Sequence, residues 1–171
     1  MEPVEQTSAT NDFPALLQVG ALPVRFENGK TQILLLTSRE TKRWVIPKGW
    51  PMKGIKNWAA AAQEAKEEAG IIGKPRKKPI GSFLYFKRRM VHFDLCRVEV
   101  YVLEYEKRLD NYRERGQREA RWFSLDEAAD RVQEPGLIAL FRDLGPILPT
   151  KSMPKSKKLV SKKSRKKRRP A

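Results

Sequence analysis

The sequence contains one cysteine and one histidine among 171 residues. Cys96 has no second thiol with which to form an internal disulfide, and its setting in HFDLCRVEVYV predicts a buried thiol on a strand. His92 has no second histidine to pair with around a metal ion, so we interpret it as structural. These absences exclude a fold held by its own disulfides, and they fit a reducing, cytoplasmic setting.

Long apolar runs are absent too. No segment approaches the roughly 18 consecutive apolar residues that a membrane-spanning helix needs. The opening residues, MEPVEQTSATNDFPALLQ, lack the basic start and apolar core of a signal peptide. We therefore expect no membrane partner and a cytoplasmic location.

Acidic residues are missing from the C-terminal end. The net charge is +16, and residues 151–171 contain eleven Lys or Arg and no acid, so this end contributes +11 and the rest about +5. We predict that residues 150–171 form a disordered basic tail that contacts RNA or another polyanion. Residues 1–15 are predicted to be a flexible N-terminus, which leaves residues 16–149 as one domain.

Within that domain, apolar patterning predicts strands and helices in a mixed order. Asn28-Gly29 is a strong hairpin turn between two predicted strands. The predicted strands are 19–27, 31–37, 44–47, 80–87, 92–104 and 120–123, with a basic loop at 73–79. Ser124 to Glu127 form a capping box that opens a helix to about residue 133, and a last helix is predicted from Pro135 to Leu144. This order indicates an α/β fold with a mixed, partly antiparallel sheet covered on both faces.

A further helix is predicted from Trp58 to Ala69, with Asn57 as its N-cap and Gly70 as its C-cap. Its last two turns carry Glu64, Glu67 and Glu68, whose spacing places them on one helix face. Negative charge at the C-terminal end of a helix opposes the helix dipole. A divalent cation such as Mg²⁺ would offset this cost, because it prefers hard oxygen ligands. The alternative is a solvated face on which Lys66 partly balances the acids.

The segment from Gly49 to Ile71 resembles the Nudix box, G-x5-E-x7-R-E-U-x-E-E-x-G-U, in which U is aliphatic. Gly49, Gly70 and Ile71 match the fixed positions, as do the three glutamates, all at the family's spacing. The sequence departs from the pattern at Ile55, which replaces the first Glu, and at Gln63, which replaces the Arg that helps to hold a catalytic carboxylate in the family. Ala65 is smaller than the usual aliphatic residue.

The resemblance implies an α/β/α sandwich and a metal-dependent pyrophosphohydrolase that cleaves phosphorus-containing anhydrides by attack of an activated water. It implies Mg²⁺ (or Mn²⁺) bound by Glu64, Glu67 and Glu68, with the backbone carbonyl of Lys48 as a further ligand. The catalytic base in the family is a box glutamate or an acid from a distant loop. Glu114 and Glu119 are the loop candidates here, and we favour Glu119. Its alternative interpretation is an ordinary surface acid beside Arg118 and Arg121.

Basic side chains near the box are candidates for binding a polyphosphorylated small-molecule substrate. We select Arg43, Lys48, Lys53, Arg76, Lys78 and Arg88, although a solvated surface charge is the simpler interpretation of any one of them. The stretch WVIPKG resembles the branch of the family that acts on diphosphoinositol polyphosphates and dinucleoside polyphosphates. This favours those substrates, with other nucleoside diphosphate derivatives as the wider class.

Two other functions fit the sequence. Gln63 and Ile55 favour a catalytically weak Nudix protein that binds RNA or another polyanion. An RNA 5′-end pyrophosphohydrolase would combine binding with turnover. The three intact glutamates favour an enzyme, because a protein that only binds polyanions gains nothing from an acidic cluster.

Overall fold

The chain begins its ordered structure with a β-hairpin, in a computed structural model that describes residues 14–146 and residue 148. Strands β1 (Leu16–Glu27) and β2 (Lys30–Thr37) are antiparallel. Asn28 and Gly29 turn between them with φ of 51° and 76°, the left-handed region that these residue types tolerate best. The sequence predicted this turn, and it is confirmed. Residues 33–36 are fully buried, as the run Ile-Leu-Leu-Leu predicted.

All strands belong to one mixed sheet. The main order is β3-β2-β1-β7-β5, with β4 paired to β1, β6 to β7 and β8 to β2. β1 and β7 run parallel, and the other pairs are antiparallel. The remaining strands are β3 (Trp44–Val45), β4 (Lys48–Gly49), β5 (Ile71–Pro75), β6 (Gly81–Arg88), β7 (Phe93–Arg108) and β8 (Ala120–Phe123). The long central pair β1 and β7 connects the two halves of the sheet.

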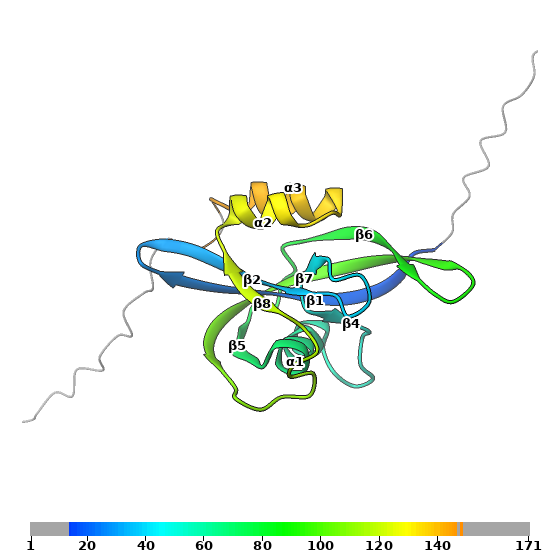
Figure 1. Ribbon diagram of the computed structural model, residues 1–171, viewed down its shortest axis with the longest axis horizontal. Coiled ribbons are helices and arrows are strands. Elements are labelled where there is room, and N and C mark those ends of the chain that lie inside the picture. Colours follow the sequence, from blue (N-terminus) through cyan, green and yellow to red (C-terminus); the bar gives the residue numbers. More distant parts are fainter. Residues whose placement is uncertain (1–13, 147, 149–171) are drawn as a thin grey trace, which may run out of the picture.

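Helices cover both faces of the sheet, as Figure 1 shows. Helix α1 (Asn57–Ala69) lies on one face, and α2 (Leu125–Arg131) and α3 (Pro135–Asp143) lie together on the other. Each face has its own buried cluster, and the cluster under α1 contains the alanines of the helix. The predicted α/β/α arrangement with a mixed sheet is confirmed.

Two local predictions were wrong. Asn57 is the first residue of α1, not its N-cap, because its side-chain amide donates to Glu99 at 3.2 Å, while Lys56 holds the cap position. The segment predicted as a basic loop begins with strand β5, which pairs with the C-terminal half of β7 through a register shift at Ile72/Gly73. A bulged strand that contains Gly, Lys and Pro carries little β signal in the sequence. The capping box at Ser124 and Glu127 and the left-handed C-cap at Gly70 are confirmed.

Most of the predicted flexible N-terminus and the whole predicted basic tail lie outside the described residues. Among the residues that the structure does describe, no helix has the length and apolar character needed to cross a membrane.

Candidate active site

The acidic face of α1 is formed by its last two turns. Ala61, Ala65 and Ala69 recur every four residues and are fully buried against the sheet, which fixes the helix rotation. Because Ala65 has no exposed surface in this packed cluster, a small residue fits this box position. The fixed rotation leaves Glu64, Glu67 and Glu68 partly buried at the helix edge.

Glu64 lies against the backbone of Gly49 in β4. A β-carbon at position 49 would lie 2.1 Å from Glu64 Oε1, so only glycine permits this approach. Burial, followed by the charges of Glu67 and Glu114, raises the pKa of Glu64 above its ordinary value. The first glycine and the first matching glutamate of the box are thus in direct contact, although they come from different elements.

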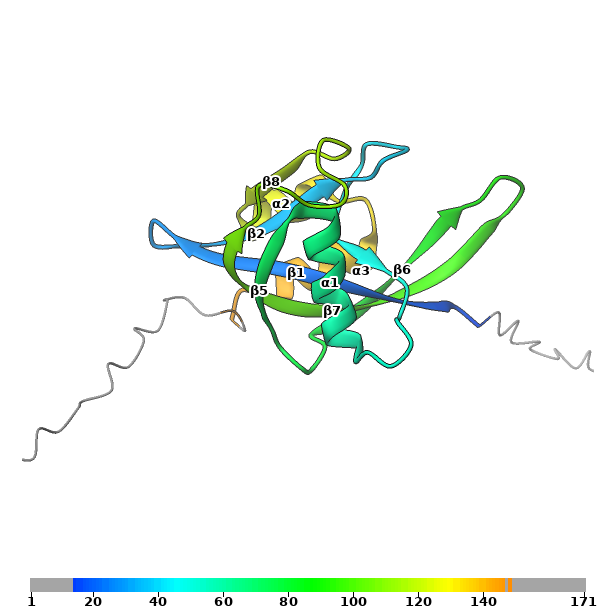
Figure 2. The ribbon, with the colours of Figure 1, turned by 90° about the horizontal axis from the view of Figure 1, so that it is seen from below.

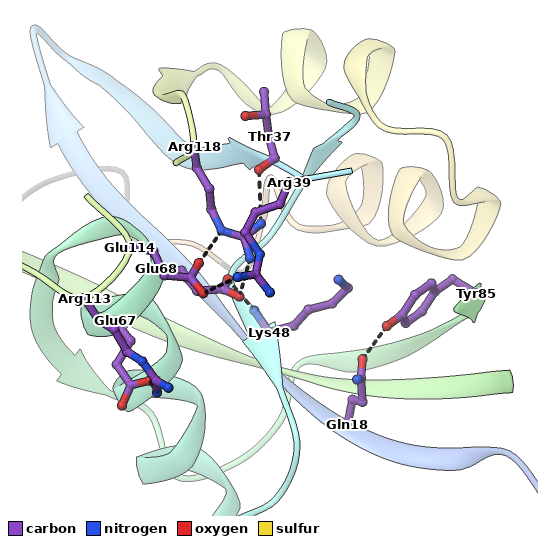
Figure 3. Close-up of polar contacts among 10 residues, drawn as sticks. All are labelled: Gln18, Thr37, Arg39, Lys48, Glu67, Glu68, Tyr85, Arg113, Glu114 and Arg118. Atoms are coloured by element: carbon purple, nitrogen blue, oxygen red, sulfur yellow. Dashed lines mark hydrogen bonds and ion pairs between the residues drawn. The ribbon is translucent and has the colours of Figure 1, made fainter. Parts of the chain in front are cut away.

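Glu68 contacts both β4 and the loop before β8. Its Oε2 accepts the backbone N–H of Lys48 at 3.2 Å, and its Oε1 accepts from Arg118 Nη2 at 3.1 Å. Arg118 also donates to Glu114 Oε2 at 2.6 Å and to the backbone oxygen of Thr37 at 3.1 Å (Figure 3). Burial raises the pKa of Glu68 to about 7, although the charges of Arg118 and Lys48 oppose this rise.

Glu67 has a different set of partners. Its Oε1 accepts from the Gln63 side-chain amide at 2.7 Å, and its Oε2 accepts from Arg113 Nη1 at 2.8 Å. The hydrogen bond from Gln63 is the main cause that lowers the pKa of Glu67, and Arg113 adds to it. Gln63 therefore contacts a box carboxylate, although it lacks the charge of the family's arginine.

The donor chemistry of these residues fits a hard divalent cation. Their side chains, as they stand, point to different partners, since Figure 3 shows Glu67 with Arg113 apart from Glu68 with Arg118 and Glu114. Accordingly, no three acidic, His or Cys side chains within residues 14–146 and 148 converge into a ready-made metal site. The neighbouring acids that raise the pKa of Glu64 show that negative charge is concentrated here. A divalent ion would fit once the carboxylates exchange arginine contacts for it.

Glu114 lies closer to the box than Glu119 does in its contacts. Glu114 shares Arg118 with Glu68, and its charge raises the pKa of both Glu64 and Glu68. The side chain of Glu119 is half exposed and forms an ion pair with Arg121 at 2.5 Å. Of the two loop acids, Glu114 is the one that the fold brings to the box carboxylates.

Two of the selected basic residues lie beside the box. The Lys48 ammonium lies 4.8 Å from the centre of the Tyr85 ring, and burial lowers the pKa of Lys48 while Glu68 and Glu134 oppose this. Arg43 forms an ion pair at 3.1 Å with Glu134, a buried residue at the N-cap of α3. Lys48 is the basic side chain with the clearest connection to the carboxylates.

The other selected basic residues lie elsewhere. Lys53 is exposed in the turn before α1, and Arg88 is exposed near the tip of the β6–β7 hairpin. Figure 2 shows β5 returning alongside α1, so the loop after β5 lies toward the N-terminal end of the helix. Arg76 in that loop is paired with Glu104 at 3.1 Å, and Lys78 is exposed. The structure does not gather these four residues with the acidic face.

Sequence reasoning missed Arg113 and Arg118. Both lie in the charged loop 109–119 that follows β7, and both contact box glutamates. The available signal was the close alternation of Arg and Glu in this loop, in YRERGQRE. That pattern indicates ion pairs without identifying the partners, because the partners lie 46 and 50 residues away in the sequence.

The family model for the NUDIX domain matches residues 16–144, and the chain belongs to the Nudix family. It is 34% identical over 113 residues to Nudix hydrolase 13, mitochondrial, from Arabidopsis thaliana, covering 63% of this chain and 55% of that protein. Nudix hydrolase 12, mitochondrial, from the same plant is 30% identical over 105 residues, covering 59% of this chain and 52% of the relative. The chain thus spans about half the length of these curated relatives.

Solved structures share the fold. The crystal structure of a C. elegans Ap4A hydrolase has a TM-score of 0.57 at 21% identity and covers 79% of this chain and 99% of that one. A NUDIX hydrolase from Nitrosomonas europaea has a TM-score of 0.59 at 16% identity and covers 77% of this chain and 89% of that one. At these identities the likeness concerns the fold.

Proposed function

We propose that this chain is a metal-dependent pyrophosphohydrolase that cleaves a diphosphate linkage in a polyphosphorylated substrate. The observation that carries the proposal is the contact of Glu64 with Gly49 and of Glu68 with the Lys48 backbone. These contacts join the two ends of the box motif into one acidic site. A fold-only relative that had lost turnover would have no need to keep Gly49 free of a side chain.

Glu64, Glu67 and Glu68 would hold Mg²⁺ (or Mn²⁺), with the Lys48 backbone carbonyl as a further ligand. The ion would supply charge neutralisation at the phosphate oxygens and lower the pKa of a bound water. Glu114 is the loop acid best placed to accept the proton of the attacking water, and Lys48 is the side chain best placed to bind a substrate phosphate. This assignment replaces our sequence-based preference for Glu119.

Dinucleoside polyphosphates are the substrate class that we favour. The WVIPKG segment supports them, as does the fold shared with a C. elegans protein described as an Ap4A hydrolase. Diphosphoinositol polyphosphates and other nucleoside diphosphate derivatives complete the class. A cytoplasmic location stays a prediction, and two relatives are named mitochondrial.

The test is a substrate screen with the full chain. Purified protein is incubated with Mg²⁺ or Mn²⁺ and dinucleoside, inositol, nucleoside and 5′-triphosphorylated RNA substrates, with a chelator control and a Glu67→Gln control. We expect metal-dependent hydrolysis of a dinucleoside polyphosphate that both controls abolish. Product incorporation of ¹⁸O from labelled water identifies the phosphorus atom attacked. Absence of turnover with every substrate would overturn the proposal.

A second candidate function is polyanion binding with weak turnover. Ile55 favours it, because this side chain is 45% exposed and supplies no carboxylate at the first Glu position of the box. The same screen decides between the two functions when RNA retention is measured beside hydrolysis.

A further inference from the structure

The loop 109–119 is fastened to the C-terminal end of α1 by its own backbone. The N–H of Leu109 donates to the Gly70 oxygen at 2.8 Å, and the N–H of Glu114 donates to the Glu67 oxygen at 3.0 Å. The ring of Tyr112 occupies the space beside Gly70, where a β-carbon would lie 2.4 Å from Tyr112 Cδ1. These contacts fix the position of the residue between them, Arg113.

The carboxylate of Glu67 is held from two sides. Gln63, one turn earlier on α1, donates to Oε1 at 2.7 Å, and Arg113 donates to Oε2 at 2.8 Å. Because one donor binds each oxygen, the plane of the carboxylate is fixed. Each oxygen keeps a further lone pair for another partner.

Folding stability does not explain this arrangement. The Arg113 side chain is 75% exposed, and ion pairs as exposed as this one contribute little to stability. Ordering a long arginine side chain also costs conformational entropy. An exposed arginine on an already fastened loop therefore has its main effect on the orientation of Glu67.

We infer that Arg113 is a positioning residue that, together with Gln63, orients the Glu67 carboxylate for a divalent cation. The loop thus supplies a positive charge that the box lacks at position 63. This inference rests on the proposed function, since it requires Glu67 to bind a metal ion.

The sign of the change in metal affinity distinguishes this role from its main alternative. An arginine that only occupied the place of the ion would compete with it, and its removal would tighten metal binding. An arginine that orients the ligand pre-organises the site, and its removal would weaken metal binding. Loss of an outer partner of a metal ligand typically weakens metal affinity by about 10–100-fold.

The experiment measures Mn²⁺ affinity by electron paramagnetic resonance and calorimetry, beside melting temperature, kcat and KM. The variants are Arg113→Ala, Arg113→Lys and the double variant Gln63→Arg/Arg113→Ala. Arg115→Ala, an exposed arginine of the same loop, is the matched control.

We expect Arg113→Ala to weaken Mn²⁺ binding by about 10-fold and to lower kcat, with KM and melting temperature nearly unchanged. Arg113→Lys should restore part of the affinity, and Gln63→Arg in the Arg113→Ala background should restore most of it. Arg115→Ala should match the wild type. If the alanine variant does not fold, Arg113→Gln answers the same question, since it keeps a donor without the charge.

Metal affinity that is unchanged or tighter in Arg113→Ala, with a wild type that binds metal and hydrolyses substrate, would overturn this inference and leave the proposed function standing. A wild type that binds no Mn²⁺ would overturn both.

Discussion

The Glu64 carboxylate lies so close to the α-carbon of Gly49 that a β-carbon there would be 2.1 Å from Glu64 Oε1. The nearest obstacle to any side chain at position 49 is thus the flexible end of a candidate metal ligand.

Gly49→Ala should therefore impair catalysis more than folding. The added methyl group would push the Glu64 carboxylate away, and a flexible side chain yields at little cost. We expect a stability loss below about 1 kcal/mol, which is the centre of measured point-mutant effects, and a loss of most of the metal affinity. Melting temperature and Mn²⁺ titration test this, with Gly145→Ala as control, because that glycine has nothing within 4 Å of the added carbon. Near-normal metal binding in Gly49→Ala would contradict the role of this contact.

Glu67→Gln and Glu68→Gln should each reduce turnover by about 10²–10⁴-fold, the range for removing a group that acts directly in proton transfer. Apo stability should stay level or rise, because each change relieves repulsion among acids at the helix end. Saturating Mg²⁺ should stabilise the wild type by mass action, by about 2.7 kcal/mol at a concentration 100 times Kd, and should not stabilise the variants. Melting with and without Mg²⁺ beside a hydrolysis assay tests both parts, and full activity in either variant would refute this assignment.

The pH dependence of apo stability should report on Glu68. Burial raises its pKa to about 7 from a model value of 4.5, so the folded state binds a proton more tightly than the unfolded state does. The stability of the wild type relative to Glu68→Gln should fall as pH rises from about 4.5 to about 7 and level off above. The difference should amount to about 1–3 kcal/mol, given 1.36 kcal/mol per pKa unit. Urea unfolding of both proteins between pH 5 and 8 without metal measures it. Parallel stability curves would show that Glu68 is not perturbed.

Glu114→Gln should lower kcat far more than Glu119→Gln. Glu114 shares Arg118 with Glu68, whereas Glu119 is half exposed and bound to Arg121. We expect a loss of about 10²–10⁴-fold for the first variant and near-normal turnover for the second. The pair is a matched comparison, because both changes remove one charge from the same loop. The reverse order of effects would restore Glu119 as the base.

Deletion of residues 150–171 should separate polyanion binding from chemistry. These residues lie outside the described structure, and the eleven Lys or Arg among them predict salt-sensitive attraction to phosphates. We expect weaker RNA retention at low salt, and a slope of log K against log salt that falls by about 0.7 per lost contact to single-stranded RNA. Hydrolysis of a small substrate should be nearly unchanged. A large loss of that hydrolysis would show that the tail belongs to the active site.

Local patterns determined much of the fold. The spacing of Glu64, Glu67 and Glu68 placed them on one helix face, because helical periodicity acts within a few residues. The Asn28-Gly29 turn, the capping box at Ser124 and the left-handed Gly70 were predictable for the same reason. Such features depend on the backbone preferences of the residues themselves.

Tertiary structure decided which residues meet the acidic face. Arg113 reaches Glu67 across 46 residues of sequence and Arg118 reaches Glu68 across 50, and no local preference encodes either contact. The same packing brings Glu114 to the box in place of Glu119, and it carries Arg76 toward the other end of α1, because β5 turns back alongside the helix. Sequence periodicity assigns a side chain to a face of its own element. The partner of that face depends on how the sheet and the long loop pack together.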